Sequence, residues 1–134
     1  MADKSSFLLR VITPDRIFYE NQVEMVEFNT TEGEIGVLPG HVPLTVILKP
    51  GRLDITEAEE NRTAALHAGF AEILPDRVTI LAEIIEWPEE IDADRAEAAR
   101  ERAEERLRSK TPETDLVRAE TALQRAIARI QVLR

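Results

Sequence analysis

The apolar residues of this 134-residue chain change their spacing abruptly at Pro88. Before it they recur at every second position, which is the repeat of side chains on one face of a β-strand. After it glycine disappears, Ala, Glu and Arg dominate, and apolar residues recur at the helical intervals of three and four. The sequence therefore predicts an α+β chain in two parts, with strands over residues 1–87 and helices over residues 88–134.

Alternation is clearest in three segments of the first part. These are Leu44, Val46 and Leu48; Leu53 and Ile55; and Val78, Ile80, Ala82 and Ile84. Turn-forming pairs such as Pro50-Gly51 and Pro75-Asp76 separate the segments at short intervals, which favours antiparallel hairpins over βαβ units. We expect a small β-sandwich or barrel with a core of its own.

The second part predicts a hairpin of two helices. The first should begin at Asp92, a good N-cap, and end among the basic residues of 106–110, whose charges suit a helix C-terminus. The second should begin at Thr111-Pro112, since Pro is tolerated at the first helical position. A narrow seam should join them, formed by Leu116, Ala119, Leu123, Ala126, Ile130 and Leu133 against Ala96, Ala99, Ala103 and Leu107. Alanine buries little area, so the hairpin should be able to detach.

Charge and composition exclude several function classes. The net charge is −9, which disfavours binding to nucleic acid or to an anionic membrane. Most of it belongs to residues 1–87, with 7 basic and 15 acidic groups (net −8), whereas residues 88–134 hold 10 and 11 (net −1). The hairpin is therefore the half able to approach an acidic partner.

Residue types needed for several kinds of site are missing. There is no Cys and there are two His, so disulfides, thiolate catalysis and a metal centre are not expected. No apolar run is long enough to span a bilayer, and the first six residues lack the apolar core of a signal peptide, so we expect a cytosolic location without bilayer insertion.

A loop rich in Gly and Pro carries a family resemblance. It runs from Glu32 to Leu44 and reads EGEIGVLPGHVPL, with glycines that permit positive φ or close backbone approach and prolines that stiffen the chain. With the segments 11–15, 69–73 and 78–82, it makes the chain resemble the epsilon subunits of bacterial-type F1Fo ATP synthase over almost its whole length. One departure is Ala68, where the family usually has a second Gly, so that turn should be less permissive.

The resemblance implies a ten-stranded antiparallel β-sandwich and a regulatory hairpin. Such a subunit is a non-catalytic rotor component that couples F1 to the proton-translocating c ring and inhibits ATP hydrolysis through its mobile helices. It is a peripheral part of the complex at the cytoplasmic face of the membrane and a monomer in isolation. Its implied partners are the gamma subunit, the c ring and, when the helices extend, the alpha and beta subunits.

Particular residues receive partner roles from the same resemblance. Glu34 and His41 would lie in the loop near the c ring and the gamma stalk, although His41 could simply bond the loop backbone and Glu34 could be solvated. Arg118, Arg125 and Arg129 would contact the catalytic beta subunits in the extended state.

The start of the helical part resembles a nucleotide-binding motif. Residues 91–96 read IDADRA, similar to the I-D-x-x-R-A motif with which some bacterial epsilon subunits bind ATP as a regulatory ligand. The implied site consists of Glu86, Ile91, Asp92, Arg95, Ala96, Arg102, Arg125 and Arg129. No P-loop is present, so side chains of both helices would hold the phosphates, which requires a folded hairpin. Each residue also has an ordinary structural interpretation: Asp92 as an N-cap, Ile91 and Ala96 in packing, and Arg102 paired with a neighbouring Glu.

Two functions from other classes remain as alternatives. An enzyme is disfavoured, because no nucleophile and base stand together and Ser occurs only at positions 5, 6 and 109. A free-standing adaptor would bind peptides through the sandwich and dimerise through the helical seam. The single Trp, Trp87, lies at the boundary and should report hairpin docking through its fluorescence.

Overall fold

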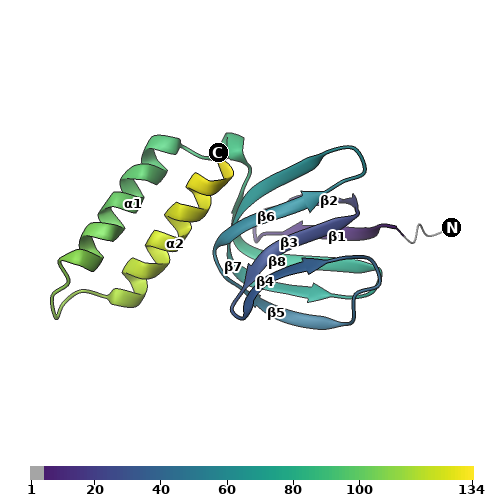
Figure 1. Ribbon diagram of the computed structural model, residues 1–134, viewed down its shortest axis with the longest axis horizontal. Coiled ribbons are helices and arrows are strands. Elements are labelled where there is room, and N and C mark those ends of the chain that lie inside the picture. Colours follow the sequence, from purple (N-terminus) through teal and green to yellow (C-terminus); the bar gives the residue numbers. More distant parts are fainter. Residues whose placement is uncertain (1–4) are drawn as a thin grey trace.

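The computed structural model describes residues 5–134 and confirms an α+β fold, with a β-sandwich followed by a two-helix hairpin (Figure 1). Within the described part, eight strands precede the helices. They are β1 (Phe7–Ile12), β2 (Ile17–Val23), β3 (Met25–Thr30), β4 (Gly33–Val37), β5 (Leu44–Leu48), β6 (Gly51–Thr56), β7 (Asn61–Ile73) and β8 (Arg77–Glu86).

The strand number and one strand direction differ from the expected ten-stranded antiparallel arrangement. Strands β7 and β8 are 13 and 10 residues long and continue through a bend instead of dividing there. Strand β7 pairs with β6 along its first half, with β5 along its second half, and with β8 along its other edge. Strand β1 runs parallel to β8. The other strands lie between these two in the sequence, so no short hairpin connection requires them to be antiparallel.

The bend lies at Ala68 and Gly69, which both have positive φ (50° and 130°). The ladder between β7 and β8 is interrupted at Ala68, and the alternation of buried positions changes phase across it. As a result Ile85 is buried and Ile84 is 39% exposed, so the prediction that Ile84 faces the core was wrong. The same phase change turns Glu86 toward the helices.

The sandwich core is a continuous cluster of apolar side chains. Its largest members are fully buried, including Phe7, Leu9, Phe28, Leu53 and Ile80. Alternation predicted most of these burial positions correctly, but Leu44, at the first position of β5, is 42% exposed.

The Gly-rich and Pro-rich segment forms β4 and the loop that follows. Gly33 and Gly40 have positive φ (122° and 82°), as their sequence context indicated, whereas Gly36 lies within β4 without a positive φ. The Gly40 amide donates to the Pro75 carbonyl at 2.8 Å, which ties this loop to the β7–β8 turn.

A short 3₁₀ helix (Pro88–Glu90) and two α-helices follow the sandwich, and one α-helix begins later than expected. Helix α1 (Ala93–Arg108) starts after Asp92, whose carboxylate accepts from the Arg95 amide at 3.1 Å, as predicted. Helix α2 (Leu116–Val132) starts after Asp115, so the prediction of a start at Thr111-Pro112 was wrong. The segment 111–114 instead closes a turn through reciprocal hydrogen bonds between Thr111 and Thr114 (3.0 and 2.9 Å).

Helix α2 lies between α1 and the sandwich (Figure 1). Its seam with α1 buries four of the five alanines predicted for it (Ala96, Ala103, Ala119 and Ala126). Ala99 is half-buried, and the terminal Leu116 and Leu133 are 42% and 37% exposed. Ala128 and Val132 are also buried, on the side of α2 away from α1. The seam pattern missed this second face, through which α2 packs on β6 and β7.

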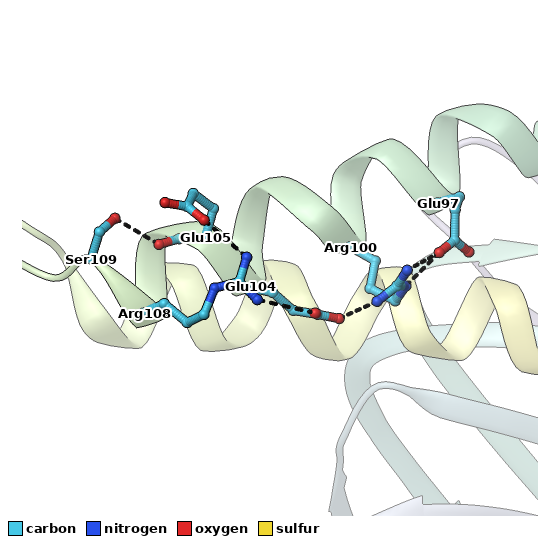
Figure 2. A network of polar contacts seen from close by, with 6 residues as sticks. All are labelled: Glu97, Arg100, Glu104, Glu105, Arg108 and Ser109. Carbon is cyan, nitrogen blue, oxygen red and sulfur yellow. Dashed lines mark hydrogen bonds and ion pairs between the residues drawn. The ribbon is translucent and has the colours of Figure 1, made fainter.

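Charged side chains along α1 pair with one another (Figure 2). Arg100 pairs with both Glu97 and Glu104, and Arg108 pairs with Glu105 at 2.9 Å. These are contacts of one turn within a single helix, so they stabilise α1 without fixing its position on α2.

Candidate functional site

The linker after β8 is fastened to the sandwich. The Trp87 indole stacks on Phe18, with ring centroids 4.3 Å apart, and the Arg62 guanidinium lies 3.9 Å from its centre on a cation–π contact. Glu90 accepts from the Trp87 amide at 3.0 Å and from Arg16 at 2.8 Å. Because Trp87 packs on the sandwich, its expected fluorescence response to hairpin docking stays a prediction.

Glu86, at the end of β8, is the acidic centre between the sandwich and α2. Its Oε1 accepts from the Arg129 Nε–H at 2.7 Å and lies 3.1 Å from the His67 Nε2. The hydrogen bond from His67, followed by that from Arg129, holds the pKa of Glu86 below its ordinary value of 4.5 against the opposing effect of burial. The Glu86 carboxylate is therefore ionised at neutral pH and joins β7, β8 and α2.

Arg125 lies one turn before Arg129 on α2 and has weaker contacts. Its guanidinium is 3.9 Å from the Glu83 carboxylate, and its buried Nε has no hydrogen-bond acceptor among the residues that the structure describes. Arg125 therefore retains unused donors.

A pocket of about 310 Å³ opens where the linker, the start of α1 and the end of α2 meet. This volume is at the lower end of the range for small-molecule sites, about 300–1,000 Å³. It is lined by Glu86, Glu90, Ile91, Asp92, Arg95, Ala96, Ala99, Arg102 and Arg129.

The pocket brings together seven of the eight residues that the sequence predicted for nucleotide binding. Arg125 is the exception and lies outside the lining. Sequence reasoning missed Glu90 and Ala99. Glu90 could have been found as the acidic residue three positions after Trp87, the spacing of a capping box, and Ala99 as the residue one turn after Ala96.

The structure separates the two residues expected near the c ring and gamma stalk. Glu34 lies in β4, not in a loop, on a surface that it shares with Gln131 and Arg134 near the end of α2. His41 lies in the loop after β4, and its Nδ1 is 2.8 Å from the Val42 carbonyl oxygen, the backbone contact considered as its ordinary structural role. Their partner roles stay predictions.

Two kinds of feature are absent from the described residues 5–134. No group of three or more His, Cys, Asp or Glu side chains in this range is arranged to hold a metal ion. No helix in it is both long enough and apolar enough to cross a membrane.

Comparison with known families decides the identity of the fold. Residues 6–88 match the model of the ATP synthase Delta/Epsilon chain beta-sandwich domain, and residues 89–134 match that of the Delta/Epsilon chain long alpha-helix domain. The chain belongs to the ATP synthase epsilon-chain family. It is thus a non-catalytic central-stalk subunit of ATP synthase, and the alternatives of an enzyme and of a free-standing adaptor are set aside.

Relatives from bacteria support this over nearly the full length. The ATP synthase epsilon chain of Caldanaerobacter subterraneus subsp. tengcongensis is 47% identical over 128 residues, covering 95% of this chain and 93% of that one. That of Bacillus licheniformis is 44% identical over 126 residues, covering 94% and 96%.

Two chains in solved structures of mitochondrial ATP synthases have a similar fold. A chain of the Euglena gracilis mitochondrial ATP synthase is 25% identical, with a TM-score of 0.85 over 97% of this chain and 82% of that chain. A chain of the Tetrahymena thermophila mitochondrial ATP synthase central stalk and c ring has a TM-score of 0.56 at 12% identity, which shows similarity of fold alone.

Proposed function

We propose that this epsilon chain senses ATP through its docked hairpin and restrains ATP hydrolysis when the hairpin is released. The observation that carries the proposal is that three arginines, Arg95, Arg102 and Arg129, line one pocket formed by both helices and the linker. Guanidinium groups bind phosphate oxygens through paired, charge-assisted hydrogen bonds. The carboxylates of the same pocket supply acceptors for sugar hydroxyls and for an amino group of the base.

The pocket exists only while the hairpin is docked, because Arg129 comes from α2 and Glu86 from β8. A ligand that bridges these elements therefore favours the docked state. Release of the hairpin would free its basic residues, including Arg118, to contact acidic segments of the catalytic beta subunits.

A second part of the proposal concerns the attachment of the sandwich to the gamma subunit and the c ring. Ile47, Phe70 and Leu81 are 63%, 45% and 37% exposed and are register partners across β5, β7 and β8. They form an apolar row on the outer face of the sandwich, which supports protein docking there. His41 lies in a loop tied to the turn between β7 and β8.

Calorimetric titration of the isolated protein with ATP tests the nucleotide site. Arg102→Ala is the sharper variant, because Arg129 also pairs with Glu86. We expect about a tenfold or greater loss of affinity, on the order of one charged hydrogen bond. Arg118→Ala, an exposed change on α2 outside the pocket, is the matched control and should retain wild-type affinity. Equal affinity of the wild type and Arg102→Ala would contradict the site.

The apolar row is tested separately with Phe70→Ser in the assembled complex. We expect the variant to fold, because Phe70 is 45% exposed, and to co-purify with gamma in reduced amount. Thr79→Ser, a mild change on the adjoining strand β8, serves as the control. Undiminished co-purification of Phe70→Ser would place the attachment elsewhere.

A further inference from the structure

His67 is a buried polar residue that the nucleotide proposal does not use. Its side chain is 0% exposed, yet it lies outside the apolar core cluster of the sandwich. It occupies β7, one of the two strands on which α2 packs. Its only recorded hydrogen-bond partner in the described part of the chain is the Glu86 carboxylate, at 3.1 Å.

The protonation of the ring follows from its neighbours. Because Glu86 is a carboxylate acceptor, the His67 Nε2 must carry the hydrogen and donate it. The His67 Nδ1 has no hydrogen-bond partner among residues 5–134, which suits an unprotonated nitrogen better than an N–H. His67 therefore acts as a single buried donor directed at one oxygen.

The same oxygen of Glu86 accepts the Arg129 Nε–H from α2 at 2.7 Å. A glutamate at the end of a strand has three rotatable side-chain bonds, and fixing them costs conformational entropy when a partner binds. The His67 donor lies within the sandwich and fixes the Glu86 carboxylate before α2 docks. Docking itself therefore requires a smaller loss of side-chain entropy.

We propose that His67 is a positioning residue, which orients Glu86 so that the carboxylate captures Arg129 and holds the helical hairpin on the sandwich. This role goes beyond nucleotide sensing, since it operates in the absence of ATP. Strand β7 therefore contributes to hairpin docking through His67, although no side chain of β7 lines the pocket.

The test compares three substitutions at His67 in the isolated, nucleotide-free protein. His67→Gln keeps an N–H donor near the position of Nε2, His67→Asn keeps an amide that is too short to reach Glu86, and His67→Leu keeps bulk without a donor. The readout is the NMR signal of the Arg129 Nε–H, assigned by its loss in Arg129→Ala. Its hydrogen-exchange rate measures how firmly Glu86 holds it.

We expect exchange at the Arg129 Nε–H to rise about tenfold in the Leu and Asn variants and to remain within about twofold of wild type in the Gln variant. A purely structural role would follow side-chain volume, so Leu, which is close to His in size, would then resemble the wild type and only the smaller Asn would differ. Exchange at the wild-type rate in Leu, or equal exchange in Gln and Asn, would overturn the proposal. His67→Met, also of similar size and without a donor, takes the place of Leu if Leu prevents folding. Because no ATP is present, failure here leaves the nucleotide site untouched, and failure of that site leaves this result untouched.

Discussion

Arg129 of α2 donates its Nε–H to Glu86 of β8 at 2.7 Å, so an arginine expected to hold phosphate already has an acidic partner. A phosphate group arriving in the pocket would compete with Glu86 for this guanidinium. Among residues 5–134, the one ionic partner of Arg125 is the distant Glu83, so Arg125 has donors to spare. Nucleotide binding and hairpin docking are therefore expected to share the same arginines.

Docking of the hairpin should weaken in acid. The pKa of Glu86 is lowered in the docked state, first by His67 and then by Arg129, from its ordinary value of 4.5. A released hairpin restores it toward that value, so the released state binds more protons in the interval between the two values. The stabilisation is complete above the pKa of the released state and is lost as the pH falls through the lowered pKa of the docked state.

Exchange at the Arg129 Nε–H, followed between pH 7 and pH 3.5, measures this effect. Other carboxylates titrate in the same range, and Glu86→Gln is the control that retains them. The difference in the exchange rate of the Arg129 Nε–H between wild type and Glu86→Gln should be present at neutral pH and disappear in acid. A difference that stays constant over the whole range would show that ionisation of Glu86 does not hold the hairpin.

Ala68→Gly should stabilise the sandwich. Ala68 has a φ of 50°, a left-handed conformation that costs an L-residue about 1–2 kcal/mol, whereas glycine adopts it freely. Glycine also gains freedom in the unfolded chain, which removes about 0.4–1 kcal/mol of this benefit. A net gain of roughly 0.5–1 kcal/mol in the free energy of unfolding should appear in urea denaturation.

The neighbouring position gives the opposite result. A Cβ at Gly69, where φ is 130°, would lie 2.0 Å from the Leu81 carbonyl oxygen, so Gly69→Ala must displace backbone. We expect clear destabilisation by the same denaturation measurement. If Ala68→Gly were destabilising while Gly69→Ala was neutral, the bend would not have the geometry described.

The paired charges of Glu97, Arg100, Glu104, Glu105 and Arg108 form a charged ladder along α1 (Figure 2). This ladder should stabilise the helix independently of docking. Arg100 pairs with Glu97 and Glu104, and these contacts raise the pKa of its guanidinium further above its ordinary value. Arg100→Gln should increase amide hydrogen exchange within α1 in low salt, with a smaller effect in high salt because exposed charges are screened. Arg106→Gln is the matched control, and an equal response in both variants would remove any special role of the ladder.

Residues 1–87 should fold without the hairpin. The sandwich has its own core, and Trp87 stacks on Phe18 within it, so the fragment must include residue 87. Cooperative thermal unfolding of the fragment, followed by Trp87 fluorescence, is the expected result. In the assembled complex, removal of residues 88–134 should release ATP hydrolysis from restraint. An unfolded fragment would contradict independent folding, and unchanged hydrolysis would contradict the regulatory role.

Local patterns in the sequence predicted the elements better than their relations in space. Alternation placed Leu53 and Val78 in the core, and the capping preference of Asp92 placed the start of α1. The prediction that Ile84 is buried failed because the phase of alternation depends on the backbone conformation at Ala68. The residue type alone does not reveal that conformation. The prediction for the start of α2 failed because the Thr114 hydroxyl accepts from the Thr111 amide and closes a turn, and Asp115 caps the helix instead.

In the candidate site too, features set by local sequence were predicted and contacts between distant segments were not. A short motif and a few arginines predicted most of the pocket lining, because neighbouring helix turns bring such residues to one end. The proposed role of His67 left no signal in the sequence, since a lone histidine within an apolar strand has no partner there. Its contact with Glu86 joins residues 19 positions apart on adjacent strands and depends on their register.

The final prediction separates the two uses of the α2 arginines. Arg125→Ala with Arg129→Ala should weaken ATP binding, because Arg129 lines the pocket and Arg125 lies one turn away on the same helix. The same double variant should weaken inhibition, since the released hairpin would lose basic contacts to the beta subunits. Asp92→Ala should act differently, because Asp92 lines the pocket and caps α1.

With the proposed site, ATP at a hundredfold excess over its Kd would stabilise the docked state by about 2.7 kcal/mol, which Asp92→Ala should reduce. Inhibition in that variant should then persist at ATP concentrations that relieve the wild type. Arg118→Ala completes the set: its ATP affinity should be normal and its inhibition weakened. Calorimetry on the isolated chains, combined with hydrolysis assays of the assembled complex over a range of ATP concentrations, measures both properties. Wild-type ATP affinity in both the double variant and Asp92→Ala would leave the arginines as partner contacts only.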